Sequence, residues 1–75
     1  MDRFTKKTFS RNLKIVREML GQTQGEFAEK IDMTPAAVSA WEKGSSFPSD
    51  KTLDKIIDIH RIDRDFLLYG EGNMF

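Results

Sequence analysis

Two helix starts and one helix stop lie within the segment TQGEFAEKIDMTPAAVSAWEKG, and they restrict this part of the chain to short helices. The Thr23 hydroxyl can accept a hydrogen bond from the amide of Glu26, whose carboxylate can reach back to the Thr23 amide, as in a capping box. Further along, Thr34 is suited to cap a helix whose first position is Pro35. Gly44 supplies the left-handed residue that commonly ends a helix. The segment therefore predicts two consecutive helices joined by a tight turn.

Apolar spacing and cap residues predict three further helices. Phe9, Leu13, Val16 and Leu20 recur at helical spacing, which places them on one face of a first helix that Gly21 ends. A fourth helix and a fifth helix are expected after two further cap residues, and a glycine ends the fifth. Those residues are Ser49, Asp63 and Gly70. No strand-like alternation or internal repeat is found, so the prediction is five short helices around one core.

The apolar faces of these helices define the expected core. It contains the stripe of the first helix together with Phe27, Ala28, Ile31, Val38, Trp41, Leu53, Ile56, Ile57 and Ile59, while Phe66, Leu67, Leu68 and Tyr69 are available for packing. Met19 and Met33 are expected to fill the core. His60 is expected at the surface, where the end of a helix favours a cation. A solvated acidic row is expected on the fourth helix, formed by Asp50, Asp54 and Asp58.

Composition excludes several classes of protein. A chain of 75 residues buries about 60% of its unfolded surface, which allows one small domain. The sequence has no cysteine and a single histidine, so disulfides, thiol nucleophiles and histidine-rich metal sites are not expected. No motif assembles a base, a nucleophile and an oxyanion site, so we expect no enzyme activity and no cofactor. We find no apolar run of ~20 residues and no signal-peptide pattern, which indicates a cytoplasmic protein without a membrane segment.

Charge is unevenly distributed along a chain whose formal net charge is zero. Residues 1–17 contain six basic side chains and one acidic side chain, whereas residues 18–75 contain six basic and eleven acidic ones. The first eight residues are therefore expected to form a basic N-terminal arm. Such an arm is either a solvated, disordered segment or a contact to phosphates, and the sequence leaves both alternatives open.

The segment TQGEFAEKIDMTPAAVSAWEKG resembles the helix-turn-helix of the phage repressor and Cro (XRE-like) family of DNA-binding regulators. The preceding NLKIVREMLGQTQ is similar to the first helix of that family, and PSDKTLDKIIDIHRIDRDFLLYGEG is similar to its two closing helices. The resemblance implies an all-α, compact five-helix lambda-repressor-like DNA-binding domain over residues 9–72. Its helix-turn-helix is formed by the second and third helices, and a short tail over residues 73–75 follows.

Roles carried over from the family fall on particular residues. The resemblance implies a structural salt bridge between Arg17 and Glu42, and a phosphate contact by the Gln24 side chain with nearby amides. The residues expected to contact the DNA backbone are Arg11, Thr23, Gln24, Thr34, Lys43, Ser45 and Ser46. Those expected to face the bases in the major groove are Pro35, Ala36, Ala37, Ser39 and Ala40.

This sequence departs from the family pattern in two places. Asp32 stands in the turn where the family usually has glycine, and aspartate tolerates the left-handed conformation better than most residues. The base-facing residues are mostly small and apolar, with Ser39 as the single hydrogen-bonding side chain among them. Three explanations remain: methyl contacts to thymine, recognition of DNA shape, or loss of base reading in favour of a protein partner. We favour the first two combined.

The function expected from this resemblance is a sequence-specific double-stranded DNA-binding transcriptional regulator. It resembles repressors of phage or mobile-element type that act as homodimers on palindromic operators. The apolar residues near the end of the chain form a candidate dimer surface, consisting of Phe66, Leu68, Tyr69 and Phe75, with Met74 beside them. The alternative is an antitoxin-like or other protein-interaction module with weak DNA binding.

Overall fold

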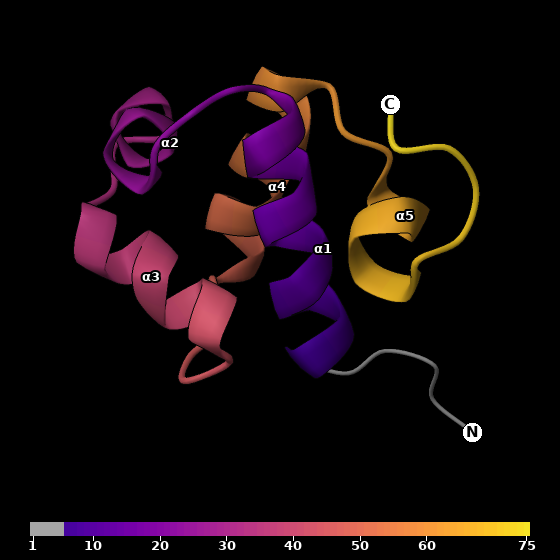
Figure 1. Cartoon of the computed structure of the whole chain (residues 1–75), viewed down its shortest axis with the longest axis horizontal. Helices are drawn as coiled ribbons and strands as arrows, with labels where there is room; N and C mark the ends of the chain where they lie inside the picture. The colour runs from indigo at the N-terminus through magenta and orange to yellow at the C-terminus, as the bar shows by residue number, and fades with distance from the viewer. Residues whose placement is uncertain (1–5) are drawn as a thin grey trace.

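The computed structural model describes residues 6–75, which form five α-helices (Figure 1). They are α1 (Lys6–Met19), α2 (Gln24–Lys30), α3 (Pro35–Lys43), α4 (Asp50–His60) and α5 (Arg64–Tyr69). The described range contains no strand. The prediction of an all-α domain with five short helices is therefore confirmed. None of the helices in residues 6–75 has both the length and the apolar character that crossing a membrane requires.

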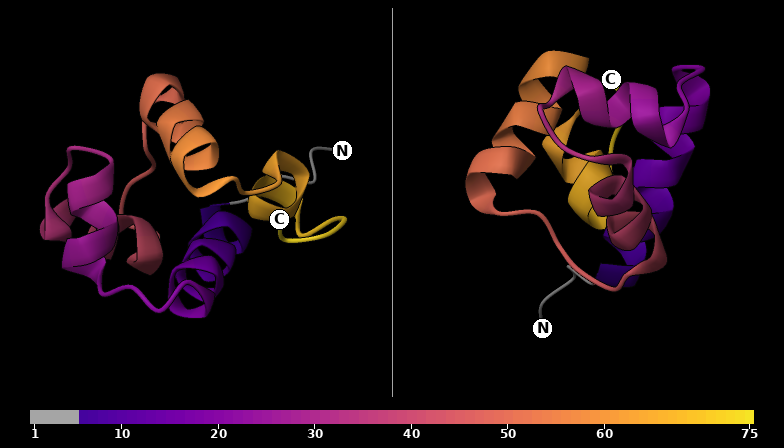
Figure 2. Two further views of the ribbon diagram at one scale, coloured as in Figure 1. Left: turned by 90° about the horizontal axis from the view of Figure 1, so that it is seen from above. Right: turned by 90° about the vertical axis from the view of Figure 1, so that its left-hand side faces the viewer.

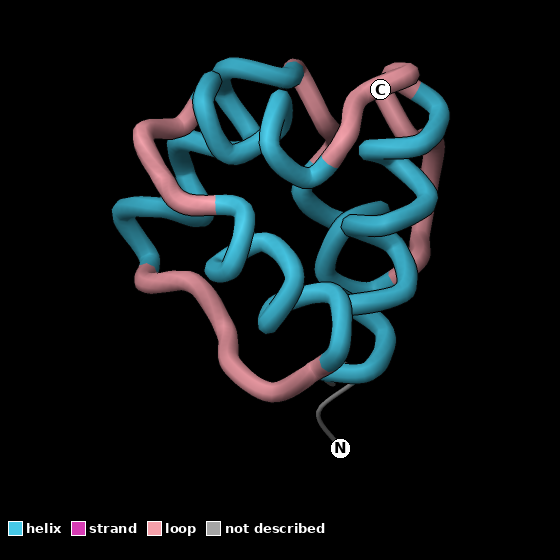
Figure 3. The backbone as a smooth tube through the Cα atoms, turned by 60° about the vertical axis from the view of Figure 1, so that its left-hand side comes forward, coloured by secondary structure: helices cyan, strands magenta, loops and turns pink. Residues whose placement is uncertain are grey.

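Helix α1 occupies the middle of the fold, with α2 and α3 on one side and α5 on the other (Figure 1). It packs directly against α3 and α5, while α2 packs against α3. Helix α4 lies on the other side of the core from α1, as the two turned views show (Figure 2). Short loops join the helices (Figure 3), so the chain changes direction sharply at each connection.

The predicted apolar stripe of α1 lies in the core. Phe9, Leu13 and Val16 are fully buried, and Leu20 is partly buried against them. Phe9 also contacts Phe47 of the α3–α4 loop edge to face, with ring centroids 4.6 Å apart, a favourable arrangement for aromatic rings. The other buried apolar side chains are Phe27, Ala28, Ile31, Val38, Trp41, Leu53, Ile56, Ile62, Leu67 and Leu68.

Side-chain caps begin four of the helices. Thr23, Thr34, Ser49 and Asp63 each accept a hydrogen bond from the amide three residues further along the chain. The Thr23 amide in turn donates to the Glu26 carboxylate at 2.8 Å, and these hydrogen bonds lower the pKa of Glu26. All four predicted caps are confirmed, and each satisfies an amide that the first turn of a helix leaves without a partner.

Left-handed residues end α3 and α5, as predicted. Gly44 follows α3 with a φ of 79°, and its amide donates to the carbonyls of Ala40 and Trp41. Gly70 follows α5 with a φ of 74°. Because a side chain at position 44 would strain this conformation, glycine allows the chain to turn sharply out of α3.

The first helix begins earlier than its apolar stripe indicates. Helix α1 starts at Lys6, so residues 6–8 of the predicted basic arm belong to its first turns. Residues 1–5 of that arm lie outside the described residues. The predicted arm is thus helical over the part that the structure describes.

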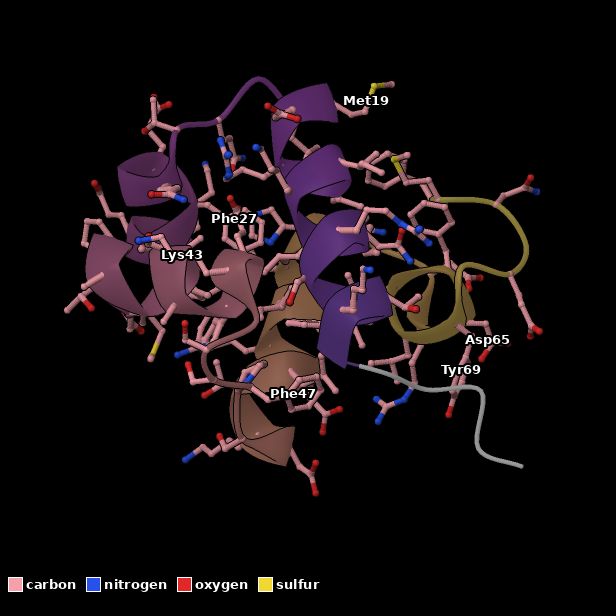
Figure 4. All side chains as sticks on the ribbon, turned by 60° about the horizontal axis from the view of Figure 1, so that its bottom comes forward. Met19, Phe27, Lys43, Phe47, Asp65 and Tyr69 are labelled. Carbon is pink, nitrogen blue, oxygen red and sulfur yellow. The ribbon has the colours of Figure 1, made fainter. Side chains whose placement is uncertain are left out.

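Three apolar side chains predicted to lie in the core are exposed. Met19, Met33 and Ile59 retain 69%, 36% and 45% of their accessible surface, and Met19 projects away from the end of α1 (Figure 4). On α4 the inward positions are taken by Ile56 and His60, four residues apart, which leaves Ile59 off the buried face. The prediction that these three side chains lie in the core was therefore wrong, because it rested on their apolar character alone.

His60 is buried, contrary to the prediction of a surface histidine. Its ring stacks on Phe27 with centroids 4.3 Å apart, and its Nδ1 lies 3.2 Å from the Ile56 carbonyl oxygen. Its Nε2 is buried and has no hydrogen-bond partner within residues 6–75. Burial lowers the pKa of His60, because the charged imidazolium loses its hydration. The residue therefore serves as a neutral aromatic side chain of the core.

The end of the chain folds back onto the domain, although the sequence assigned it only as a short tail. The Met74 carbonyl oxygen accepts a hydrogen bond from the Asp63 amide at 2.9 Å. The Met74 side chain is partly buried against the core. This segment therefore covers the loop that connects α4 to α5.

The predicted ion pair between Arg17 and Glu42 is present and joins α1 to α3. Arg17 Nε lies 2.6 Å from Glu42 Oε2, and Arg17 Nη2 donates to Oε1 at 3.2 Å. Arg17 Nη1 also donates to the Gln22 carbonyl at 2.7 Å. The side chains of Arg17 and Glu42 are only 12% and 5% exposed. The hydrogen bonds to Glu42 raise the pKa of Arg17, although burial alone would lower it.

We predict that Arg17→Met lowers the free energy of unfolding by about 3 kcal/mol, because it leaves the Glu42 carboxylate largely buried without its cation. Urea unfolding at neutral pH measures this change. The double variant Arg17→Met with Glu42→Leu removes both charges and should recover most of the loss. Additive losses in the double variant would show that the two residues act independently.

We predict that the domain becomes less stable as the pH falls below about 6.5, the pKa of an unfolded-state histidine. Because the pKa of His60 is lowered in the folded state, the unfolded chain binds the proton first, and stability present above that pH is lost on acidification. Urea unfolding between pH 7.5 and pH 5 measures the trend. His60→Phe retains an aromatic ring against Phe27 and should remove this dependence, since the chain has one histidine. An unaltered pH profile in His60→Phe would contradict the assignment of the pH dependence to His60.

Candidate nucleic-acid interface

Helices α2 and α3 form a helix-turn-helix unit that is closely packed where they meet. Ala28 is fully buried, and its carbonyl accepts a hydrogen bond from the Met33 amide at 2.9 Å. The chain reverses at Asp32, whose φ of 56° confirms that aspartate adopts the left-handed conformation here. Lys55 of α4 lies 3.0 Å from the exposed Asp32 carboxylate, a surface ion pair that contributes roughly 0–1 kcal/mol. The turn thus tolerates the replacement of the usual glycine.

The outward side of α3 consists of small residues. Val38 and Trp41 point into the core, so Trp41 is a packing residue, as predicted. Helix α3 lies at the outside of the molecule, on the opposite side of α1 from α5 (Figure 1). Of the predicted base-facing residues, Pro35 and Ala36 are exposed, and Ser39 and Ala40 are partly exposed. Ala37 is partly buried and packs against the core. Apart from the Ser39 hydroxyl, this surface offers no side-chain hydrogen-bonding group.

Gln24 lies beside the ion pair that joins α1 to α3. Its Nε2 donates to Glu42 Oε1 at 3.1 Å, and the same carboxylate accepts hydrogen bonds from Arg17. The orientation of the Gln24 amide therefore depends on the position of α3. Sequence reasoning assigned Gln24 and the ion pair separately and missed this hydrogen bond, because the two residues meet only after α2 has folded across α3.

Two threonines among the predicted backbone contacts also cap helices. Thr23 Oγ1 accepts from the Glu26 amide at 3.1 Å, and Thr34 Oγ1 accepts from the Ala37 amide at 3.2 Å. Both residues are exposed. In each cap the oxygen acts as the acceptor, so the hydroxyl hydrogen can still be donated to a phosphate oxygen.

The remaining predicted backbone contacts lie around the end of α3. Lys43, Ser45 and Ser46 are exposed where the chain leaves the helix. Arg11 is exposed on α1 and lines the same surface hollow as Lys43. Lys7 also lines this hollow, although its sequence position placed it in the predicted arm. The spacing of four residues between Lys7 and Arg11 was the available signal, since it puts both on one face of a helix.

The acidic row of α4 is exposed, as predicted. Asp50, Asp54 and Asp58 all face solvent, and Asp54 pairs with Arg64 of α5 at 3.0 Å. Carboxylates on this surface repel phosphates. The row therefore adds negative charge to the exposed surface of α4, where Lys51 and Lys55 are also exposed.

The predicted dimer surface is only partly available. Leu68 is buried in the core with 7% of its surface exposed, so it does not present itself to a partner. Phe66 and Tyr69 are partly buried, whereas Phe75 is 56% exposed. Asp65 and Tyr69 lie on the opposite side of the molecule from Lys43 (Figure 4). The inclusion of Leu68 in this surface was therefore wrong, because α5 turns that side chain inward.

Comparison with known proteins identifies a sequence relative. A family model described as helix-turn-helix matches residues 13–67. The chain is also 43% identical over 65 residues to an uncharacterized HTH-type transcriptional regulator, YqaE, of Bacillus subtilis strain 168. The match covers 87% of this chain and 56% of YqaE, so the chain spans about half the length of this relative.

Two solved structures share the fold. The P22 c2 repressor protein, in complex with synthetic operator 9T, has a TM-score of 0.78 and 21% identity over 84% of this chain and 96% of its own. FeII HppE in complex with substrate has a TM-score of 0.79 and 26% identity over 92% of this chain, but only 40% of HppE is covered. Residues 6–75 contain no group of three or more His, Cys, Asp or Glu placed to hold a metal ion. Because the family model matches more than half of the chain, the chain belongs to the XRE-type helix-turn-helix family.

Proposed function

We propose that this protein is a sequence-specific, double-stranded DNA-binding transcriptional regulator, a repressor of phage or mobile-element type, with α3 as its recognition helix. The observation that carries the proposal is the surface of α3, whose outward side chains are small enough to enter the major groove. Groups that can bind phosphates lie at the start of α2 and around the end of α3. They are Thr23 and Gln24, then Lys43, Ser45 and Ser46.

The relatives support this proposal. YqaE is named as a transcriptional regulator, and the P22 c2 repressor shares the fold and was crystallised with an operator. The polar groups around α3 would position the domain on the sugar-phosphate backbone, since such contacts fix register without reading sequence. The outward side of α3 is then left to discriminate between base pairs.

The small side chains of α3 offer two ways to discriminate between base pairs. The methyl groups of Ala36 and Ala40 can pack on the C5-methyl of thymine, which distinguishes T-containing steps in the major groove. Their small size also brings the helix close to the bases, so that DNA shape and deformability affect the binding energy. Ser39 adds one short hydrogen-bonding group. We therefore propose recognition by methyl contact and shape.

We further propose that the protein binds as a homodimer to a palindromic operator whose half-sites lie about one helical turn, ~34 Å, apart. The exposed Phe75 and the partly exposed Phe66 and Tyr69 support a dimer surface near α5. This surface lies away from the end of α3 (Figure 4), so dimer formation and DNA binding would not compete. Sedimentation that shows a monomer at high protein concentration would contradict this part of the proposal.

We predict that Ala36→Glu raises the Kd for duplex DNA by about 100-fold or more, because the carboxylate is forced against the groove. Ala36→Gln is the neutral control of similar size, and Ile59→Glu adds the same charge at an exposed position of α4. Fluorescence anisotropy with a labelled duplex measures all three. Equal binding by Ala36→Glu and Ile59→Glu would show that α3 does not enter the groove.

A further inference from the structure

An open hollow lies on the surface between the first half of α1 and the end of α3. It has a volume of about 480 Å³, which is ample for a phosphodiester group. Its walls are formed by Lys7, Ser10 and Arg11 of α1 together with Glu42, Lys43 and Gly44 at the end of α3.

The hollow is surrounded by cations that no carboxylate neutralises. Lys7, Arg11 and Lys43 are exposed, and none of their side chains has a hydrogen-bond or ion-pair partner among residues 6–75. The one acidic residue of the wall is Glu42, whose carboxylate is held by Arg17 and is only 5% exposed. In a chain of zero net charge, this hollow is therefore a local concentration of positive charge.

A hydrogen bond between the two helices fixes the wall of the hollow. The Trp41 carbonyl of α3 accepts it from the Ser10 hydroxyl of α1 at 2.6 Å, and the same carbonyl accepts the cap bond from the Gly44 amide at 3.2 Å. The Ser10 bond holds α1 against the last turn of α3. Because Lys7 and Arg11 share a face of α1, their positions relative to Lys43 are set by this junction.

We propose that the hollow is a phosphate site in which Lys7, Arg11 and Lys43 together bind one phosphate of the DNA backbone. The proposal rests on the proposed function and extends it, because it assigns Lys7 to the interface and places Arg11 and Lys43 in one site. Arginine can bind a phosphate through two parallel hydrogen bonds, and lysine contributes a point charge. A phosphate bound between α1 and α3 would fix the tilt of α3 in the groove.

The salt dependence of binding tests this proposal. The logarithm of the affinity for duplex DNA falls linearly with the logarithm of the salt concentration, by about 0.9 for each phosphate neutralised. The variants are Lys7→Gln, Arg11→Gln and the triple variant that combines both with Lys43→Gln. The matched control is Arg61→Gln, which removes an exposed cation at the end of α4, far from the first turn of α1 (Figure 1).

We expect each single variant to reduce the slope by less than one, and the triple variant by about one in total, because all three residues serve one phosphate. A reduction of about two or more in the triple variant would show separate phosphates and overturn the single site. A triple-variant slope equal to that of Arg61→Gln would overturn it entirely. Failure of the wild-type protein to bind duplex DNA would contradict the proposed function itself, whereas wild-type binding with unaltered variant slopes contradicts only the phosphate site.

Titration of the DNA-free protein with inorganic phosphate, followed by NMR, separates the two sources of the anion. Weak shifts that do not saturate, together with the reduced slope in DNA binding, support a backbone phosphate. Saturable binding at the amides around Ser10 and Gly44 with unaltered DNA slopes would assign the hollow to a free anion and overturn the proposal.

Discussion

The ion pair between Arg17 and Glu42 is the interaction on which the arrangement of the interface depends. It joins α1 to the last turn of α3, and the Glu42 carboxylate also accepts a hydrogen bond from Gln24 at the start of α2. A single carboxylate thus links three helices. Removing one partner from a largely buried pair leaves a charge without compensation, so the structure strongly favours the geometry in which all three groups meet. The angle of α3 and the orientation of the Gln24 amide follow from this contact.

The charges of the domain are separated in space although they cancel in sum. Cations without carboxylate partners surround the hollow beside the end of α3, whereas Asp50 and Asp58 are exposed on α4. In the proposed complex this separation would orient a domain of zero net charge on DNA, because like charges repel phosphates from one face and opposite charges attract them to the other. The small side chains of α3 would then need to provide shape and methyl contacts only. A plain recognition helix is compatible with specific binding when its position is fixed by the groups around it.

Local sequence signals predicted the helices correctly. The residues that were predicted wrongly are those whose burial depends on tertiary contacts. The caps Thr23, Thr34, Ser49 and Asp63 were predictable because a cap is formed within one turn of the chain. The burial of His60 was not predictable, because a histidine at the end of a helix can be either a surface cation or a buried ring. Its stacking on Phe27 of α2 determines that the ring is buried. In the interface, the outward positions of α3 and the ion pair followed from family resemblance. The hydrogen bond of Gln24 depends on how α2 meets α3, and the hollow beside Lys43 depends on how α1 meets α3. No local pattern encodes either contact.

Selection of bound duplexes from a random pool, at near-physiological salt, tests sequence-specific recognition most directly. Low salt would favour phosphate contacts alone, so the salt concentration is essential to the design. We expect enrichment of a palindrome with T-containing half-sites, as methyl contacts and a dimer require. Absence of any enriched sequence, with binding that disappears as salt rises, would contradict specific recognition, and it would favour a protein-interaction module with weak DNA binding instead.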